Sequence, residues 1–491
     1  MTKKIVILGG GPAGYVAALR AAQLGAGVAL VEAREIGGTC LNRGCIPTKA
    51  MVAAAERLRA ARTNADFGIL TGTPRVDMAA LVARRQAVTE QLRGGVEHLL
   101  AARKVELIAG RGRLVSARAV RVSAGGDDHG EGRGQSEADG HGEGSGEGDR
   151  RGESDAGEVE VTGDAVIVAT GSEPTMPPLF EVDDPRVVTS DGLLAMDVLP
   201  ESLAIVGGGV IGCELASIFA ALGVRVTVVE MLAQLLPGED RRAAAALTQA
   251  FRKAGVESRL KARVERLDLA SPDAVRLALA DGSVVEAALV LVCVGRSPVS
   301  RGLGYEEAGL AIDGRGFVVT DDTQRTSLDG VFAAGDVCGP PLLAHWAYEQ
   351  GAVAAENAVS DGRGAVDRRF VPSCIFSHPE VASFGTSEDQ AKAEDLAVTV
   401  AQVRFNGNSK AVIEGESDGY IRIVARADDR RVIGASLVGP HVTELVHELV
   451  LAAQAGLTLD DVAATIHAHP TLAEGVGEAA LGALGRGLHT L

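Results

Sequence analysis

The sequence is short of long apolar runs, of positive charge and of cysteine. It contains no stretch of about 18 consecutive apolar residues, so no membrane-spanning helix is expected. Its 48 Lys and Arg residues are outnumbered by 65 Asp and Glu, and a net charge of −17 argues against nucleic acid as a partner, because such binding begins by neutralising phosphates. The apolar run at residues 5–8 ends at glycines, so we expect no secretion signal and a cytoplasmic protein.

Cysteine is too scarce for a disulfide scaffold, with six in 491 residues. Four of the six are scattered through apolar or glycine-rich stretches and are interpreted as small buried side chains: Cys213, Cys293, Cys338 and Cys374. No second close pair exists to complete a four-ligand zinc site, so no metal is expected. Only Cys40 and Cys45 form a local pair.

The chain opens with a strand, a tight turn and a helix. Residues 4–8 are almost entirely apolar, as in a parallel strand buried on both faces, and an alanine-rich helix is predicted up to about Leu24. A glycine fingerprint between them lets the backbone approach a pyrophosphate at a helix N-terminus. Glu32 closes the second strand, where an acid accepts hydrogen bonds from ribose hydroxyls. We therefore predict a dinucleotide site formed by Gly9, Gly11, Pro12, Ala13, Gly14 and Glu32.

The same pattern returns about 200 residues later. Strands are predicted at residues 203–206 and 224–230, and a helix at residues 214–222. The turn between them carries a second fingerprint, made by Gly207, Gly209 and Gly212. This internal repeat predicts two doubly wound nucleotide-binding units.

Glu230 holds the ribose position of the second unit, 21 residues after Gly209. A carboxylate repels a 2′-phosphate, and residues 231–233 offer no arginine to hold one, so NAD is favoured over NADP. The alternative is that Glu230 is only a solvated strand end.

Residues 124–157 contain 12 glycines, ten acidic residues and no Val, Ile, Leu, Met or aromatic residue. Such a segment cannot bury enough apolar surface to offset its ordering entropy. Residues 119–122 and 159–161 flank it and look like the two arms of a hairpin. We predict a disordered loop at the tip of that hairpin.

The last 120 residues have no glycine fingerprint. Residues 421–424 and 432–438 alternate like antiparallel strands, and helical stretches follow at residues 443–455, at residues 460–466 and near the C-terminus. This pattern predicts an α+β docking domain.

The cysteine pair lies in the segment Gly37-Gly38-Thr39-Cys40-Leu41-Asn42-Arg43-Gly44-Cys45-Ile46-Pro47-Thr48-Lys49. On an ideal helix, positions i and i+5 point about 140° apart, whereas a disulfide needs Cα atoms within about 7 Å. The glycines are therefore expected to distort the segment. Pro47 is tolerated only near a helix start, which places Cys45 in a first turn, where the positive helix end lowers a thiol pKa. We interpret the pair as reactive.

A thiol pair beside two dinucleotide sites predicts electron relay between NAD and a disulfide. Hydride transfer and thiol–disulfide exchange do not couple readily without a carrier, so a flavin is expected and the predicted cofactors are FAD and NAD. Lys49, one of eight lysines, would place a positive charge near the flavin with Glu214 as its counter-ion; the alternative is an ordinary surface lysine.

Two further strand ends look like flavin contacts. Thr170 and Gly171 follow the buried strand 165–168. Asp336 follows the strand 330–333, where its carboxylate would accept a ribityl hydroxyl or simply cap a helix.

The chain's far end supplies candidates for an acid/base group. His469 precedes Pro470 and is therefore extended, and Glu474 lies five residues on, able to orient the imidazole ring. Thr471 and Glu474 also read as a capping box that starts the last helix. His467 is the alternative base.

These residues together resemble the flavin disulfide oxidoreductases, and within them the dihydrolipoamide dehydrogenases. The resemblance runs over nearly the whole chain and rests on six motifs: GGTCLNRGCIPTK at 37–49, GGGVIGCE at 207–214, AAGDV at 333–337, LAH at 343–345, SHPEVASFG at 377–385 and HAHPTLAE at 467–474. The insert at residues 124–157 is not a feature of the family.

The resemblance implies a role for each candidate. Cys45 lies against the flavin as a thiolate, and Cys40 exchanges with substrate. His469, paired with Glu474, acts as the base and comes from the other subunit of a homodimer. The remaining implied contacts are the Lys49–Glu214 ion pair and Ala344 beside the flavin, and Gly295 in the NAD site.

The implied fold is α/β, with two Rossmann-like domains that bind FAD and NAD and a C-terminal α+β dimerisation domain. The expected segments are 1–172 for FAD, 173–298 for NAD, 299–368 completing the FAD domain and 369–491 for the interface.

The implied activity is oxidation of protein-bound dihydrolipoyl groups through the disulfide and FAD, with NAD+ as acceptor. The implied partners are lipoyl domains and the peripheral-subunit-binding domain of 2-oxo acid dehydrogenase complexes, or the H protein of glycine cleavage. Glutathione reductase would carry basic residues for NADP, mercuric reductase would end in a vicinal cysteine pair, and soluble transhydrogenase would lack the redox cysteines. A non-catalytic docking subunit would not explain Cys40, Cys45 and His469.

Overall fold

The structure, a computed structural model, describes residues 2–123 and 158–489. Two compact units arise from interleaved segments: unit 1 contains Met1–Gly38, Gly94–Ser172 and Pro298–Val366, and unit 2 contains Thr39–Arg93, Glu173–Ser297 and Asp367–Leu491. The predicted division into four segments stays a prediction. The predicted disordered loop, residues 124–157, lies outside the described residues. No helix in the described ranges is long and apolar enough to cross a membrane.

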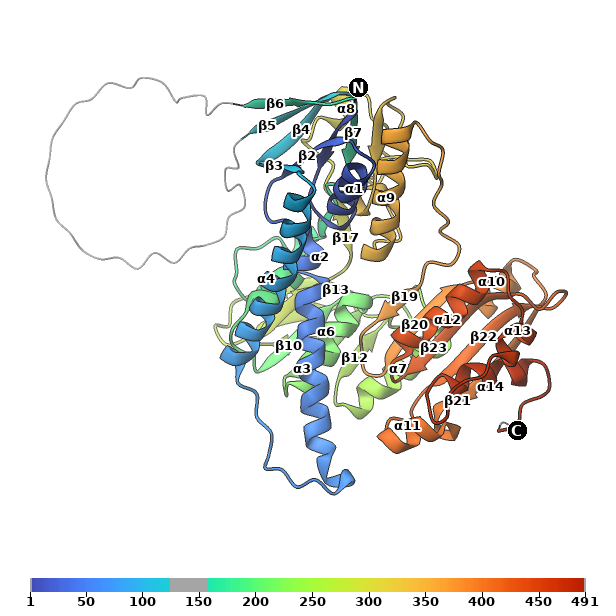
Figure 1. Cartoon of the computed structure of the whole chain (residues 1–491). Helices are drawn as coiled ribbons and strands as arrows, with labels where there is room; N and C mark the ends of the chain where they lie inside the picture. The colour runs from blue at the N-terminus through green and yellow to red at the C-terminus, as the bar shows by residue number, and fades with distance from the viewer. Residues whose placement is uncertain (1, 124–157, 490–491) are drawn as a thin grey trace, which may run out of the picture. The chain divides into compact units, whose positions relative to one another are not determined.

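Unit 1 is built around a parallel five-stranded sheet in the order β18-β7-β1-β2-β3. Its strands are β1 (Lys4–Leu8), β2 (Gly27–Glu32), β3 (Glu106–Ala109), β7 (Ala165–Val168) and β18 (Val331–Ala333). Helix α1 (Pro12–Gln23) follows β1 and lies beside α9 (Ala344–Ser360) (Figure 1). Small residues allow this approach, since a Cβ on Gly351 would stand 2.3 Å from the Ala13 carbonyl oxygen.

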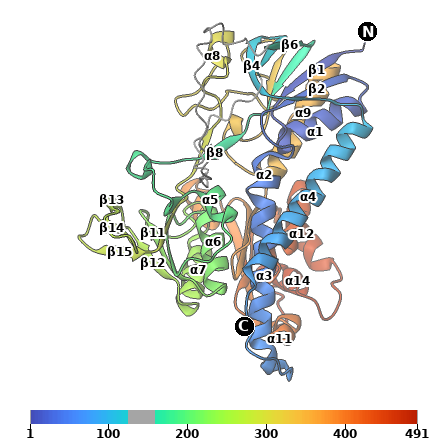
Figure 2. The ribbon, with the colours of Figure 1, turned by 90° about the vertical axis from the view of Figure 1, so that its left-hand side faces the viewer.

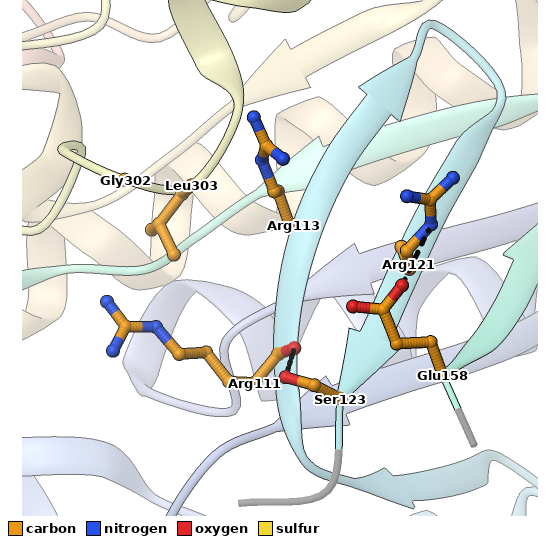
Figure 3. A pocket seen from close by; sticks show the side chains of 7 residues that line it. All are labelled: Arg111, Arg113, Arg121, Ser123, Glu158, Gly302 and Leu303. Atoms are coloured by element: carbon orange, nitrogen blue, oxygen red, sulfur yellow. Dashed lines mark hydrogen bonds and ion pairs between the residues drawn. The ribbon is translucent and has the colours of Figure 1, made fainter. Parts of the chain in front are cut away.

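A second sheet of unit 1 is antiparallel and contains β4 (Arg111–Ser116), β5 (Ala119–Ser123) and β6 (Val159–Thr162). Pairing of β5 with β6 confirms the predicted hairpin arms. Arg121 on β5 forms an ion pair of 3.4 Å with Glu158, just before β6 (Figure 3). Unit 1 also contains α8 (Tyr305–Ala308) and the 3-10 helix η3 (Asp336–Cys338).

Unit 2 contains the second parallel sheet, in the order β12-β11-β10-β16-β9. Its strands are β9 (Val187–Val188), β10 (Ser202–Val206), β11 (Arg225–Glu230), β12 (Glu257–Leu260) and β16 (Leu289–Val292). The helices of this part are α5 (Ser190–Ala195), α6 (Val210–Ala221) and α7 (Arg241–Lys253). The predicted start of α6 at Glu214 is wrong, because the helix begins directly after Gly209 and points its N-terminus at the glycine loop.

An antiparallel meander lies beside this sheet (Figure 2). Its strands are β13 (Val264–Asp268), β14 (Val275–Leu279) and β15 (Val284–Ala287). Val275 and Leu277 of the meander share a buried apolar cluster with Val206 and Val229 of the parallel sheet. The long helix α3 (Cys45–Thr63) packs on α6 (Figure 1).

The C-terminal part of unit 2 is an antiparallel sheet in the order β19-β20-β23-β22-β21. Its strands are β19 (Ser373–Ile375), β20 (Glu380–Gly385), β21 (Val398–Arg404), β22 (Tyr420–Arg426) and β23 (Val432–Gly439). The accompanying helices are α10 (Glu388–Ala393), α11 (Ser409–Glu414), α12 (Val442–Gln454), α13 (Leu459–Ala464) and α14 (Glu474–Ala483). Helices α12 and α14 pack on the sheet and enclose one apolar core, which confirms the predicted α+β character.

The remaining elements connect these layers. They are α2 (Gly38–Asn42), α4 (Met78–Ala102), β8 (Ser172–Pro174), β17 (Arg296–Pro298) and the 3-10 helices η1 (Asn64–Phe67), η2 (Pro178–Phe180) and η4 (Phe405–Gly407).

Candidate active site

The segment that carries the cysteine pair folds as two helices with a break between them. The short α2 carries Cys40, and α3 begins at Cys45 itself. Gly44 is the N-cap of α3, and a Cβ there would stand 3.1 Å from the carbonyl oxygen of Thr39. Because the helix is interrupted, the Cys40 thiol reaches Cys45 and donates a hydrogen bond to it, which one continuous helix would prevent.

The surroundings of Cys45 favour the thiolate form of its side chain. The hydrogen bond from Cys40 lowers the pKa of Cys45 from 9.0 to about 7. Desolvation of the sulfur opposes this change, the Lys49 ammonium lowers the pKa further, and the Glu214 carboxylate raises it. A pKa near neutrality is what thiol–disulfide exchange at neutral pH requires.

Lys49 and Glu214 form the predicted ion pair, from α3 and α6. Lys49 Nζ lies 2.9 and 2.8 Å from the two carboxylate oxygens of Glu214, whose side chain is only 5% exposed. Phe376, which our sequence analysis missed, donates its backbone N–H to Glu214 Oε1 at 2.9 Å and places its ring 4.5 Å from Lys49 Nζ. The only signal for Phe376 is its place directly before the SHPEVASFG motif. The buried carboxylate is thus held by a cation and an N–H donor.

His469 and Glu474 also come together. His469 Nδ1 lies 2.9 Å from Glu474 Oε1, and Glu474 Oε2 accepts the backbone N–H of Thr471 at 2.9 Å. These two hydrogen bonds, Thr471 first, lower the pKa of Glu474, so it remains a carboxylate that orients the ring. The predicted capping box is only half formed, because α14 begins at Glu474 and the Thr471 hydroxyl donates to Ala468 instead.

His467, the alternative base, is placed differently. Its side chain is 10% exposed against 70% for His469, and its Nε2 lies 2.9 Å from Glu448 Oε1. The ring also packs on Gly477, where a Cβ would stand 2.8 Å from His467 Nδ1. His467 is therefore part of the local packing, while His469 presents its ring to the surface.

The first glycine loop, in unit 1, has the geometry of a pyrophosphate cradle. Gly9 has a φ of 98°, and a Cβ there would lie 2.3 Å from the Ala169 carbonyl oxygen. A Cβ on Gly14 would lie 1.8 Å from the Gly9 oxygen, so α1 and β1 meet closely. At Gly11 the nearest atom to such a Cβ would be 3.9 Å away, which leaves the backbone approachable from outside. Pro12 occupies the first turn of α1, where its missing N–H is harmless.

The second loop, in unit 2, repeats this geometry. Gly207 has a φ of 114°, and a Cβ there would lie 2.5 Å from the Cys293 carbonyl oxygen. A Cβ on Gly212 would lie 2.1 Å from the Gly207 oxygen, whereas one on Gly209 would meet nothing within 4 Å. Both loops therefore fit a dinucleotide phosphate at a helix N-terminus.

The two ribose-position acids hold their loops. Glu32 accepts the N–H groups of Gly10 at 2.5 Å and Arg34 at 2.8 Å. Glu230 accepts those of Gly208 and Leu232, both at 2.7 Å. Glu230 is only 6% exposed, so the alternative of a solvated strand end is wrong. Contact of either acid with a ribose stays a prediction.

The other predicted FAD contacts lie in unit 1. The Thr170 hydroxyl donates to the Val299 carbonyl at 2.6 Å, and Gly171 follows it. Asp336 accepts a hydrogen bond of 2.6 Å from Ser172, and no side-chain cap is formed on η3, which disfavours the capping alternative. Ala344 is the first residue of α9, and Leu343 is the N-cap of that helix.

Gly295, the predicted NAD contact, has a φ of 140° and accepts the Thr175 N–H at 3.0 Å. The cofactor roles of these residues stay predictions.

Of the four cysteines interpreted as small buried side chains, Cys213 is buried, whereas Cys293, Cys338 and Cys374 are half-buried. Burial raises the pKa of Cys293, Cys338 and Cys374 to about 12, and burial also raises the pKa of Cys213. Within the described ranges, no group of three or more His, Cys, Asp or Glu residues is placed to hold a metal ion.

Comparison with known proteins identifies the family. The family model described as "Pyridine nucleotide-disulphide oxidoreductase" matches residues 3–351. The model of the family's dimerisation domain matches residues 371–480, and this second match supports a homodimer. Dihydrolipoyl dehydrogenase of Halobacterium salinarum is 40% identical over 99% of this chain and 97% of that protein. Dihydrolipoyl dehydrogenase of Bacillus subtilis is 38% identical over 99% of this chain and 98% of that protein.

Solved structures give the same result. LpdA from Mycobacterium tuberculosis has a TM-score of 0.86 and 29% identity, covering 98% of this chain and 99% of that one. The HOCl-induced flavoprotein disulfide reductase RclA from Escherichia coli has a TM-score of 0.82 and 27% identity, covering 97% and 99%. The chain belongs to the pyridine nucleotide-disulphide oxidoreductase family.

Proposed function

We propose that this chain is an FAD-dependent dihydrolipoyl dehydrogenase that uses NAD+ as its acceptor. The observation that carries the proposal is the hydrogen-bonded pair Cys40 and Cys45, with a pKa of about 7 at Cys45, in a chain 38–40% identical to dihydrolipoyl dehydrogenases over 99% of its length. A non-catalytic docking subunit would have no need of a thiol activated in this way.

The cysteines would act by thiol–disulfide exchange. In the oxidised enzyme, Cys40 and Cys45 share a disulfide, and a substrate thiolate attacks the sulfur of Cys40 and releases Cys45 as a thiolate. The second substrate thiolate then displaces Cys40, which leaves a cyclic substrate disulfide and two reduced cysteines. The Lys49 ammonium, which lowers the pKa of Cys45, favours release of Cys45 as the thiolate in the first exchange. Once the second exchange has freed Cys40, its regained thiol donates a hydrogen bond to the Cys45 thiolate.

His469 would remove the proton from the substrate thiol. Glu474 fixes the ring through Nδ1, which leaves Nε2 to accept the proton. We propose that this histidine serves the active site of the other subunit of a homodimer. Two exposed apolar side chains of the C-terminal part support an interface: Ile466, three residues before His469, is 97% exposed, and Leu451 on α12 is 65% exposed.

The two glycine loops would hold the cofactors, FAD at Gly9, Gly11 and Gly14 and NAD at Gly207, Gly209 and Gly212. Bound FAD supplies the electron carrier between the enzyme dithiol and NAD+. The buried carboxylate of Glu230 would accept hydrogen bonds from ribose hydroxyls and repel a 2′-phosphate, which favours NAD over NADP.

The expected partners follow from the substrate. Lipoyl domains would present the dithiol, and the peripheral-subunit-binding domain of a 2-oxo acid dehydrogenase complex, or the H protein of glycine cleavage, would bring it to the enzyme. A cytoplasmic location is also proposed, because six cysteines in 491 residues are too few for the disulfide scaffold of a secreted protein.

The test is an anaerobic assay of the purified holoenzyme with dihydrolipoamide and NAD+. We expect NADH to form, much less product with NADP+, and no turnover in Cys45→Ser. Cys374→Ser is the matched control, because burial raises the pKa of that thiol to about 12 and it lies outside the proposed chemistry. Absence of NADH formation by the unmodified enzyme would overturn the proposal.

A further inference from the structure

Unit 2 contains a pocket of about 260 Å³ that the proposed catalysis does not use. Three segments line it: residues 42–47 at the junction of α2 and α3, residues 85–93 of α4, and residues 191–195 of α5. Three arginines face it from two of these segments, namely Arg43, Arg85 and Arg93. Volumes of roughly 300–1,000 Å³ are typical for drug-sized ligands, so this pocket suits a smaller molecule.

Arg85 is the unusual member of the cluster. It is 9% exposed, and its Nη1 donates to the carbonyl oxygen of Leu194. In the part of the chain that the structure describes, no carboxylate forms an ion pair with it. Desolvation lowers its pKa, and no neighbouring charge opposes that effect. A guanidinium keeps its proton and its five N–H donors, so a positive charge is buried here without a counter-ion, which is unfavourable unless an anion joins it.

The other arginines increase the positive charge of the pocket. Arg43 Nε lies 3.7 Å from Asp191 Oδ2, and Arg93 Nη1 lies 3.5 Å from Asn42 Oδ1. The carboxylates that line the pocket are Asp191 and the exposed Glu90, so three guanidinium groups face two carboxylates. Planar guanidinium groups bind phosphate oxygens through paired hydrogen bonds.

We propose that this pocket binds a small oxyanion of the phosphate class, with Arg85 as its main ligand and Arg43 and Arg93 beside it. Inorganic phosphate and the head of a small phosphate monoester share this chemistry. The site is separate from the two dinucleotide loops and does not rest on the proposed dehydrogenase activity.

A second arginine-lined pocket shows why burial matters. In unit 1, Arg111, Arg113 and Arg121 line a cavity of about 130 Å³ (Figure 3). There the side chains of Arg113 and Arg121 are 53% and 43% exposed and pair with Glu307 and Glu158. Arg113 and Arg121 are exposed to solvent and paired with carboxylates, so they serve as the control for the proposed site.

The position of the pocket connects it to the redox segment. Asn42 and Arg43 stand between Cys40 and Cys45 in the sequence, and both line the pocket. An anion held there brings negative charge to the segment that carries both thiols, and negative charge disfavours a thiolate.

The experiment measures phosphate binding to the holoenzyme by calorimetry and thermal shift. Saturating NAD+ occupies the second glycine loop, and chloride at the same ionic strength controls for screening. We expect saturable stabilisation by inorganic phosphate, a dissociation constant raised about tenfold or more in Arg85→Gln and Arg93→Gln, and no change in Arg113→Gln. Arg93 is only half-buried, so its variant tests the site even if Arg85→Gln fails to fold.

Glycerol 2-phosphate, titrated in parallel, separates the two sources, because tighter binding than inorganic phosphate indicates an organic phosphate as the ligand. Equal effects of phosphate and chloride would overturn the proposal. Unchanged phosphate binding in both pocket variants would also overturn the proposal. A protein that binds no phosphate, and whose dimer dissociates in Arg85→Gln, would overturn it too and would identify a carboxylate of the second subunit as the partner of Arg85.

Discussion

The hydrogen bond between the two cysteines predicts a large and measurable effect on Cys45. It is the largest influence that lowers the pKa of Cys45 from 9.0 to about 7. Cys45 is exposed, so water screens this interaction, and its effect is measured as the pKa difference of about two. Cys40→Ala removes the donor, whereas Cys40→Ser keeps a hydroxyl donor at the same place. Both variants leave Cys45 as a single thiol that cannot form the disulfide.

The assay is a pH titration of the two holoenzymes, with the oxidised flavin's long-wavelength thiolate band as the readout. We expect the midpoint of Cys40→Ser to lie well below 9.0 and that of Cys40→Ala to rise toward 9.0. In Cys40→Ala, desolvation is the largest remaining influence, and only the Lys49 charge and a backbone hydrogen bond still lower the pKa. At pH 7 the thiolate fraction would fall from about one half at a pKa of 7 to about 1% at a pKa of 9.

The control is Cys374→Ala in the Cys40→Ser background, which should leave the midpoint unchanged, since Cys374 has a pKa of about 12. Equal midpoints in Cys40→Ser and Cys40→Ala would refute the reasoning. They would mean that the helix N-terminus or Lys49, not the neighbouring thiol, governs Cys45.

Three further predictions concern the rest of the site. Lys49→Met should lower the free energy of unfolding by about 2–3 kcal/mol in chemical denaturation, because it leaves the 5% exposed Glu214 carboxylate without its cation. Adding Glu214→Gln should restore more than half of that loss, and additive losses from the two substitutions would contradict the coupling. His469→Gln should lower the turnover rate with the dithiol about 100-fold or more, whereas His467→Gln, at a side chain only 10% exposed, should lower it less than about tenfold. The reverse order in steady-state rates would assign the base to His467. Gly14→Ala should lower the free energy of unfolding by about 1–3 kcal/mol, because its Cβ would stand 1.8 Å from the Gly9 oxygen. It should also reduce the FAD retained on purification, measured as flavin per protein, and full flavin occupancy would contradict this prediction.

The parts of the site that depend on local chain geometry could be predicted from sequence. The two glycine loops, the start of α3 at Cys45 and the strands β1 and β10 each follow from neighbouring residues, and the family prediction is confirmed by the relatives. The start of α6 was misplaced by four residues, because apolar Val210 and Ile211 give no boundary signal of their own.

Contacts between distant segments could not be predicted in the same way. The N–H of Phe376 reaches Glu214 across 162 residues of sequence, and no periodicity encodes that bond. The burial of Arg85 could not be predicted either, since the sequence of α4 is typical of a largely solvated helix. In the structure, Leu194 of α5 covers the turn that carries Arg85. Glu214 itself was found only because it closes a recognisable motif.

The two charges beside the cysteines act on Cys45 in opposite directions, and this limits what the ion pair can do. Lys49 lowers the pKa of Cys45 and Glu214 raises it, so a pair held at 2.8 Å has a small net effect on the thiol. If thiolate stabilisation were the pair's purpose, a lysine without a bound carboxylate would serve better. The carboxylate, held also by the Phe376 N–H, instead fixes the position of the Lys49 ammonium. The pKa of Cys45 is then set mainly by the Cys40 thiol. A mixed disulfide between Cys40 and a substrate removes that donor, and Lys49 is then the neighbouring side chain that still lowers the pKa of Cys45.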